Sequence, residues 1–229
     1  MTQLFSSDAL EGEIALVTGA SRGIGASIAE ALAAAGAAVI GTATSQGGAD
    51  SISAALGDKG RGIVLDVADP DSVAAAVKDV QSSEGSPTIL VNNAGITRDN
   101  LLMRMKQEEW DDVVATNLTG MFSVCKACLR GMMKAKKGRI INIASVVGVM
   151  GNPGQSNYAA TKAGMIGFFG AGGLSPEQIE SAIDTLTTRL GDTPFGFNLI
   201  HSPNDPDLEQ KTVDLYLTKG IHLVSASAY

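Results

Sequence analysis

Short apolar runs alternate with helix-like stretches along most of the chain. The segments between these runs carry helical periodicity, and the runs themselves lie at residues 13–18, 37–43, 62–67, 88–95 and 138–148. A short continuous apolar run is typical of a parallel strand that is buried on both faces. Strands that alternate with helices predict an α/β fold, in which a doubly wound parallel sheet carries helices on both faces.

The expected helices follow each of these strands in turn. Pro70 directly after Asp69 is a favourable helix start. The pattern predicts helices over residues 23–35, 48–57 and 70–80, two more within 107–136, and another that begins near Ser156.

A run of glycines after Phe169 interrupts the helix that begins near Ser156, and strand and helix signals then resume. They predict a helix over 176–190 with Ser175 as its N-cap, a strand within 195–201, a helix over 205–219 and a strand within 221–229. A sheet that ended at residue 145 would expose an apolar edge. We therefore expect residues 194–229 to add two parallel strands, so that residues 1–229 form a single domain.

Composition and charge narrow the classes of function. The chain has 229 residues, of which 45% are hydrophobic and 18% charged, a composition that can bury a substantial core. A net charge of −7 argues against nucleic-acid binding. We expect a cytoplasmic protein without membrane contact, because neither a signal peptide nor a membrane-spanning run is visible. Cys125 and Cys128 have no histidines at zinc-like spacing, so no metal site is expected.

Three glycines, Gly19, Gly23 and Gly25, lie between the first strand and the first helix. Glycine lets the backbone turn sharply and approach a pyrophosphate closely, while the helix start offers free N–H groups. This placement predicts a Rossmann-like dinucleotide-binding domain.

The residues after the second strand indicate which dinucleotide is bound. NAD sites usually place an acidic side chain there, but this chain has Thr44 and Ser45, with Arg22 in the glycine turn. A cation with hydroxyls suits a 2′-phosphate, so NADP(H) is favoured; the alternative is that Arg22 is a solvated loop charge. Asp66, at the end of the third strand, is placed to accept from the adenine amino group.

Tyr158 and Lys162 are four residues apart and project from one helix face. A free tyrosine is too weak an acid to exchange protons easily at neutral pH, whereas a nearby ammonium favours its ionised form. Ser145, at the end of the fifth strand, can hold a carbonyl oxygen as charge develops on it. The alternative for the tyrosine and lysine alone is an amphipathic surface helix.

With Asn117, these residues and the motifs TGASRGIG, NNAG and YAATK resemble the short-chain dehydrogenase/reductase family. Over residues 8–168 the resemblance is closest to the bacterial 3-oxoacyl-(acyl-carrier-protein) reductases of fatty-acid biosynthesis. It implies NADPH-dependent reduction of a 3-oxoacyl thioester that is linked to acyl-carrier protein. Tyr158 would donate the proton, Ser145 would hold the ketone oxygen, and Asn117 would support a proton relay. Lys162 would tune Tyr158 and grip the nicotinamide ribose.

The same resemblance implies a set of cofactor-binding residues. They are Gly19, Ser21, Arg22, Gly23, Ile24, Gly25, Thr44, Asp66, Val67, Asn92, Ala94, Gly95, Tyr158 and Lys162.

The resemblance stops after residue 168. Residues 169–229 resemble the start of the flavin-dependent enoyl reductase subunit of polyunsaturated fatty-acid synthases, so the chain looks like a chimera. The substrate lid of the first family has no counterpart, and the altered helix after Tyr158 weakens any homo-oligomer. The alternatives are therefore an NADP(H)-binding protein without turnover and a fragment of a flavin-dependent enoyl reductase. About 60 residues are too few for the barrel of the latter, which needs roughly 250.

A basic segment precedes the fifth strand. Residues 126–139 hold six of the 17 basic residues of the chain, where an acidic carrier protein could dock. The alternative is a solvated helix face whose cations are favoured near the helix C-terminus.

Overall fold

A computed structural model describes residues 6–165, 175–190, 197–200, 206–221 and 223–227. The glycine run after Phe169 and most of the stretch that stands in place of the substrate lid lie outside these residues. The strands are β1 (Ile14–Val17), β2 (Ala38–Ala43), β3 (Gly60–Val64), β4 (Ile89–Asn92), β5 (Arg139–Ile143), β6 (Phe197–Ile200) and β7 (Leu223–Ser227).

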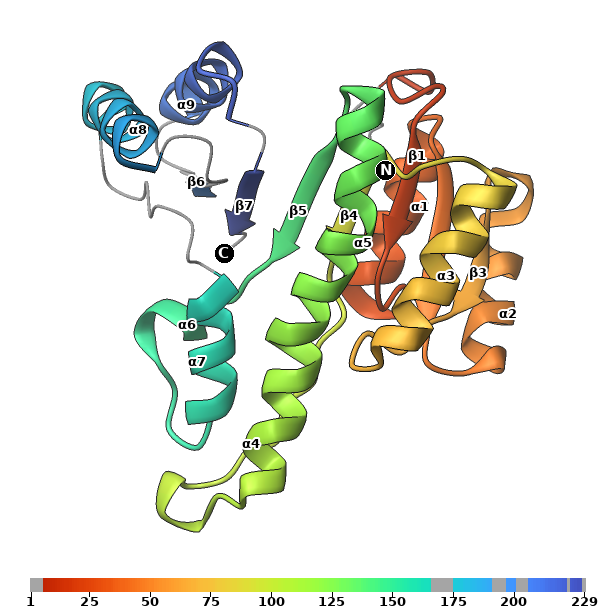
Figure 1. The fold of residues 1–229 in the computed structure, drawn as a ribbon, viewed down its shortest axis with the longest axis horizontal. Coiled ribbons are helices and arrows are strands. Elements are labelled where there is room, and N and C mark those ends of the chain that lie inside the picture. Colours follow the sequence, from red (N-terminus) through yellow and green to blue (C-terminus); the bar gives the residue numbers. More distant parts are fainter. Residues whose placement is uncertain (1–5, 166–174, 191–196, 201–205, 222, 228–229) are drawn as a thin grey trace.

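Helices fill the connections between the strands (Figure 1). The α-helices are α1 (Gly23–Ala34), α2 (Gln46–Leu56), α3 (Pro70–Ser83), α4 (Gln107–Val114), α5 (Gly120–Ala135), α6 (Val147–Met150), α7 (Ser156–Met165), α8 (Pro176–Leu190) and α9 (Pro206–Thr218). The short 3-10 helices are η1 (Gly57–Lys59) and η2 (Leu102–Arg104), and η3 (Ala115–Thr119) is a π-helical turn between α4 and α5.

All of these strands pair in parallel in one sheet of order β3-β2-β1-β4-β5-β7-β6. The chain runs outward from β1 to β3 and then returns to β4 on the other side of β1. This reversal opens a crevice at the carboxyl ends of β1 and β4, the usual ligand position in an open α/β sheet. The expected α/β fold is confirmed.

Two apolar layers cover the faces of the sheet, and residues of β1 divide between them. Leu16 packs with residues of α3 and α5, such as Val77 and Val124. Ala15 and Val17 pack on the opposite face with residues of α1 and α2. Alternate strand residues point to opposite faces, so both layers need apolar residues. This requirement explains why the strand runs are continuously hydrophobic.

The two C-terminal strands extend the sheet as expected. β7 pairs with β5, and β6 pairs with β7 at the outer edge. Helices α8 and α9 lie side by side next to these strands (Figure 1) and share a small cluster of their own. Its buried members are Ile179, Ile183, Tyr216 and Ile221.

Local capping explains where several helices begin. The Ser45 side chain accepts from the N–H of Gly48 at the start of α2, and Asp69 accepts from Asp71 at the start of α3. The Ser175 hydroxyl accepts from the N–H of Gln178 in the first turn of α8. Helices α3 and α8 begin at Pro70 and Pro176 as expected, whereas α2 begins at Gln46, two residues earlier than expected, because Ser45 caps it.

The fifth strand is shorter than expected. It ends at Ile143, and residues 147–150 form the short helix α6 instead of continuing the strand. Ser145 initiates this turn, because its side-chain oxygen accepts from Val147 N–H and its carbonyl accepts from Gly148 N–H. Ser145 therefore lies two residues beyond the strand and not at its last position. Asp66 likewise lies two residues beyond β3.

Among the described residues, no helix is long and apolar enough to cross a bilayer.

Candidate active site

Two cavities meet at the carboxyl edge of the sheet. One, of about 540 Å³, is lined by the glycine turn and the ends of β2, β3 and β4. The other, of about 650 Å³, contains Ser145, Tyr158 and Lys162. Both are lined by the same five residues, Arg22, Ile24, Asn93, Gly95 and Ile96. The two cavities therefore form one continuous groove, with the glycine turn at one end and the candidate catalytic groups at the other.

The glycine turn is shaped for close approach of backbone. Gly19 has a φ of +65°, and a Cβ atom there would lie 3.0 Å from Ala94 Cα. A Cβ on Gly25 would lie 2.3 Å from Gly19 O, so no other residue fits without a backbone shift. Helix α1 starts at Gly23 without a side-chain cap and without an acidic residue in its first turn. Its N–H groups and the positive end of its dipole therefore remain available to an anionic ligand.

The predicted NADP(H) determinants line the same cavity. Arg22, Thr44 and Asp66 are all exposed there, with Ser21 beside them. No acidic partner pairs with Arg22 among the residues that the structure describes. A guanidinium that is exposed and unpaired at the cavity wall suits a phosphate group.

Other predicted cofactor residues differ in their exposure. Ala94 and Gly95 line the groove, and Val67 lines it from a largely buried position. Asn92 lines neither cavity: it is 4% exposed and donates to Oδ1 of Asn142 on the neighbouring strand β5 and to Sγ of Cys125 on helix α5. Asn93, which sequence reasoning passed over, lines both cavities and donates to the carbonyls of Thr18 and Gly19.

Tyr158 and Lys162 lie together on α7. The Lys162 ammonium is 5.6 Å from the centre of the Tyr158 ring and donates to the Ile143 carbonyl over 2.8 Å. Only 4% of Lys162 is exposed. Burial lowers the pKa of Lys162 to about 8, because a charged ammonium loses hydration there. The carbonyl at the end of β5 thus binds the buried Lys162 ammonium and keeps it beside the Tyr158 phenol.

Ser145 lines the same cavity as Tyr158 and Lys162. It follows β5, is half-buried, and starts the turn into α6. A hydroxyl held in this way can donate to an oxygen that is bound in this cavity.

Asn117 lies behind the cavity wall in the π-helical turn η3, with 1% of its surface exposed. Its Oδ1 accepts from Ile96 N–H over 2.8 Å, and its Nδ2 donates to Ile96 O over 2.9 Å. Its Nδ2 also lies 3.3 Å from Thr161 Oγ1, one residue before Lys162. The side chain thereby connects the loop after β4 to the helix that carries Tyr158 and Lys162.

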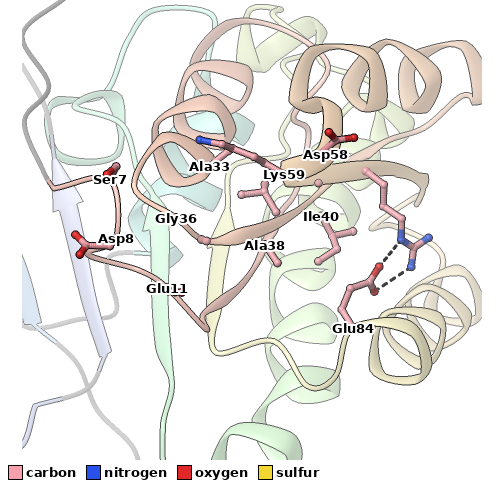
Figure 2. A pocket seen from close by; sticks show the side chains of 14 residues that line it. Ser7, Asp8, Glu11, Ala33, Gly36, Ala38, Ile40, Asp58, Lys59 and Glu84 are labelled. Atoms are coloured by element: carbon pink, nitrogen blue, oxygen red, sulfur yellow. Dashed lines mark hydrogen bonds and ion pairs between the residues drawn. The ribbon is translucent and has the colours of Figure 1, made fainter.

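A further cavity, of about 720 Å³, lies at the opposite edge of the sheet (Figure 2). It is lined by the amino ends of β2 and β3 and by the turn around Ser7 and Asp8. The Arg61 guanidinium beside it already pairs with Glu84 and Asp79, both over 2.6 Å. None of the predicted catalytic or cofactor residues lines this cavity.

Comparisons with known proteins agree with this geometry. Residues 13–183 match the short chain dehydrogenase family. The chain is similar to the 3-oxoacyl-[acyl-carrier-protein] reductases FabG of Vibrio cholerae (65% identical over 159 residues) and Escherichia coli (63% over 158 residues). It is also similar to that of Pseudomonas aeruginosa (61% over 162 residues).

Each of these three matches covers 69% of this chain. The match covers 65% of the Vibrio and Escherichia proteins and 66% of the Pseudomonas protein. The fold, the glycine turn, the Tyr158–Lys162 pair and these matches lead to one conclusion: the chain belongs to the short-chain dehydrogenase family.

Proposed function

We propose that the protein reduces a 3-oxoacyl thioester to the 3-hydroxyacyl form with NADPH. The observation that carries this proposal is the continuous groove that joins the glycine turn to Ser145, Tyr158 and Lys162. The names of the relatives described above support the same substrate class.

The residues of the second cavity have complementary roles in this reaction. NADPH, when bound, supplies the hydride that reduces the ketone carbon. Ser145 donates a hydrogen bond to the ketone oxygen, and Tyr158 gives that oxygen its proton. The Lys162 ammonium stabilises the phenolate that Tyr158 leaves behind, and this effect is strong because the ammonium is buried. The hydrogen bonds of Asn117 fix the position of the loop after β4 relative to helix α7.

The glycine turn fits a dinucleotide, and its neighbours favour the phosphorylated form. The uncapped start of α1 and the glycine cradle would hold the pyrophosphate. Arg22 and Thr44 would bind the 2′-phosphate, and Asp66 would accept from the adenine amino group. Lys162 would also bind the nicotinamide ribose.

We expect Arg22→Ala to weaken NADPH binding and to leave NADH binding nearly unchanged. The exposed guanidinium contributes a charge-assisted hydrogen bond of about 1.5–3 kcal/mol to a phosphate that NADH lacks. Titration of nicotinamide fluorescence with each cofactor measures both affinities. An equal loss for the two cofactors would show that Arg22 does not read the 2′-phosphate.

The buried Lys162 predicts a decline in activity on the alkaline side. With a pKa lowered to about 8, Lys162 is an ammonium below that pH and loses its charge as the pH rises through it. We therefore expect kcat/KM, which reports the free enzyme, to fall above about pH 8. Lys162→Arg keeps its charge, so whatever its absolute rate, its profile should stay flat there. A decline of the same shape in both proteins would contradict the assignment.

We infer that the thioester is presented by acyl-carrier protein. The basic residues of 126–139 lie on α5, in the turn that follows it and at the first position of β5, and all six of them are exposed. One of them, Lys137, is paired with Glu13. The remaining cations offer an acidic carrier a surface of opposite charge.

We also infer that residues 169–229 come from a second protein, related to the flavin-dependent enoyl reductases, and serve here to complete the sheet. A flavin absorbance band in the purified protein would instead support the enoyl reductase alternative.

The proposed function is tested by NADPH oxidation with acetoacetyl-CoA, run beside a fluorescence titration of NADPH. Turnover together with NADPH binding is the expected result. Binding without turnover would favour the alternative of a nucleotide-binding protein whose substrate side is too open to react.

A further inference from the structure

Asn157, the residue before Tyr158, is fully buried and makes hydrogen bonds through both ends of its amide. Its Nδ2 donates to the carbonyls of Arg98 over 2.9 Å and Glu109 over 3.0 Å. Its Oδ1 accepts from the N–H of Tyr158 over 2.8 Å. None of its surface is exposed. Asn157 therefore joins three segments: the loop after β4, helix α4 and the first turn of α7.

Neighbouring contacts continue this connection along the cavity wall. The Gln155 side chain donates to both carboxylate oxygens of Asp99, each over 3.1 Å. The N–H of Asn100 donates to Gly154 O over 2.8 Å. Residues 98–100 thus run against residues 154–157 in opposite directions, and we call this pairing the wall clasp. Asn157 is its buried member and the one adjacent to the phenol.

Two of the three backbone groups that bond to Asn157 have no partner within a helix or the sheet. The Tyr158 N–H lies in the first turn of α7, where backbone donors have no acceptor within the helix. Arg98 lies in a loop, so its carbonyl has no helical or sheet partner. Buried groups left unsatisfied in this way are costly, and the segments that carry them would rearrange. Such a rearrangement would change the shape of the catalytic cavity, because Arg98 and Tyr158 both line it.

We propose that Asn157 is a positioning residue, which fixes Tyr158 relative to Lys162 and to the substrate wall around Arg98. The proposal rests on the proposed ketoreductase function for its kinetic test. Asn157 does not touch substrate or cofactor in this role. It acts by holding the first turn of α7 against the wall clasp, so the phenol stays 5.6 Å from the ammonium.

Two substitutions separate positioning by hydrogen bonds from simple filling of space. Asn157→Ala removes every bond, whereas Asn157→Asp keeps the acceptor and loses both donors. A buried carboxyl titrates above its usual range, and its neutral form regains one O–H donor. Gln107→Ala is the control, because Gln107 is exposed on α4 and bonds only to Asp111 within that helix.

We expect both Asn157 variants to lower kcat with acetoacetyl-CoA at about pH 8 by roughly 10- to 100-fold, the effect of a small misplacement of a catalytic group. NADPH affinity should stay near that of the parent, and Gln107→Ala should match the parent in both respects. Between about pH 8 and pH 6 the rate of Asn157→Asp relative to the parent should recover several-fold, whereas that of Asn157→Ala should not. The charged groups around Asn157, namely Arg98, Asp99, Glu109 and Lys162, are present in all the proteins, and Asn157→Ala, which adds no charge, shows the pH dependence that arises without a carboxyl at this position.

A ratio that does not change with pH for Asn157→Asp, or a kcat within about threefold of the parent for both variants, would overturn the proposal. If the parent itself does not reduce acetoacetyl-CoA, the proposed function fails, and amide hydrogen exchange then tests Asn157. Exchange in residues 98–104 and 156–162 should be faster in Asn157→Asp than in the parent at about pH 8, with the difference reduced at about pH 6. Equal protection of both segments in all proteins would overturn the positioning role.

Discussion

Tyr158→Phe is expected to abolish ketoreductase activity and to leave NADPH binding largely intact. Tyr158 is the phenol that shares its cavity with Ser145 and Lys162, and no other phenol, carboxyl or thiol among the described residues lines that cavity. Removal of a general acid typically costs about 10²- to 10⁴-fold in rate. NADPH oxidation with acetoacetyl-CoA measures the loss, and nicotinamide fluorescence measures cofactor binding.

Tyr216→Phe provides the matched control for this substitution. Tyr216 is also a largely buried tyrosine, but it lies on α9 in the C-terminal cluster and lines neither half of the groove. The Tyr216→Phe variant should keep the rate of the parent. A Tyr158→Phe variant that retained most of the rate would mean that another group donates the proton.

Much of this site could be predicted from the sequence because its parts are local. The glycine turn is one short segment that contains the three glycines, Arg22 and the start of α1. The spacing of these residues along the chain is therefore enough to predict a pyrophosphate site. Tyr158 and Lys162 are one helical turn apart, and any helix there places them together. Ser145 was expected at a strand end and lies instead two residues beyond it, because its own side chain starts a turn.

The features that were not predicted depend on contacts between distant segments. Asn157 has no special spacing to Arg98 or Glu109, and its role appears only when the loop after β4 folds against α7. Asn92 belongs to the family motif, yet successive strand residues point to opposite faces, and its side chain bonds to Asn142 of β5 and Cys125 of α5 instead of lining the groove. The periodicity predicted two C-terminal strands but not their order, because a strand signal does not specify its neighbour. In the structure β7 lies beside β5.

The position of β7 between β5 and β6 supports the proposal that residues 1–229 form a single domain. Val224 is in register with Ile141 of β5 on one side and with Phe197 of β6 on the other. The helices beyond it, α8 and α9, have a separate apolar cluster. Within the part of the chain that the structure describes, the pairing of β7 with β5 is therefore the main connection between that cluster and the rest of the molecule.

Val224→Pro is expected to destabilise the whole protein and not only its C-terminal part. Proline removes an N–H from an interior strand and is poorly tolerated there, so the free energy of unfolding should fall by at least about 2 kcal/mol. Trp110, the single tryptophan of the chain, lies on α4 and reports the unfolding of the N-terminal part by its fluorescence. If the strands unfold as one unit, the Trp110 transition should move to lower denaturant concentration in Val224→Pro, whereas Val224→Thr, which keeps the N–H, should shift it little. An unchanged Trp110 midpoint in Val224→Pro would mean that the C-terminal segment folds independently, because a cooperative sheet cannot lose an interior strand without weakening its neighbours.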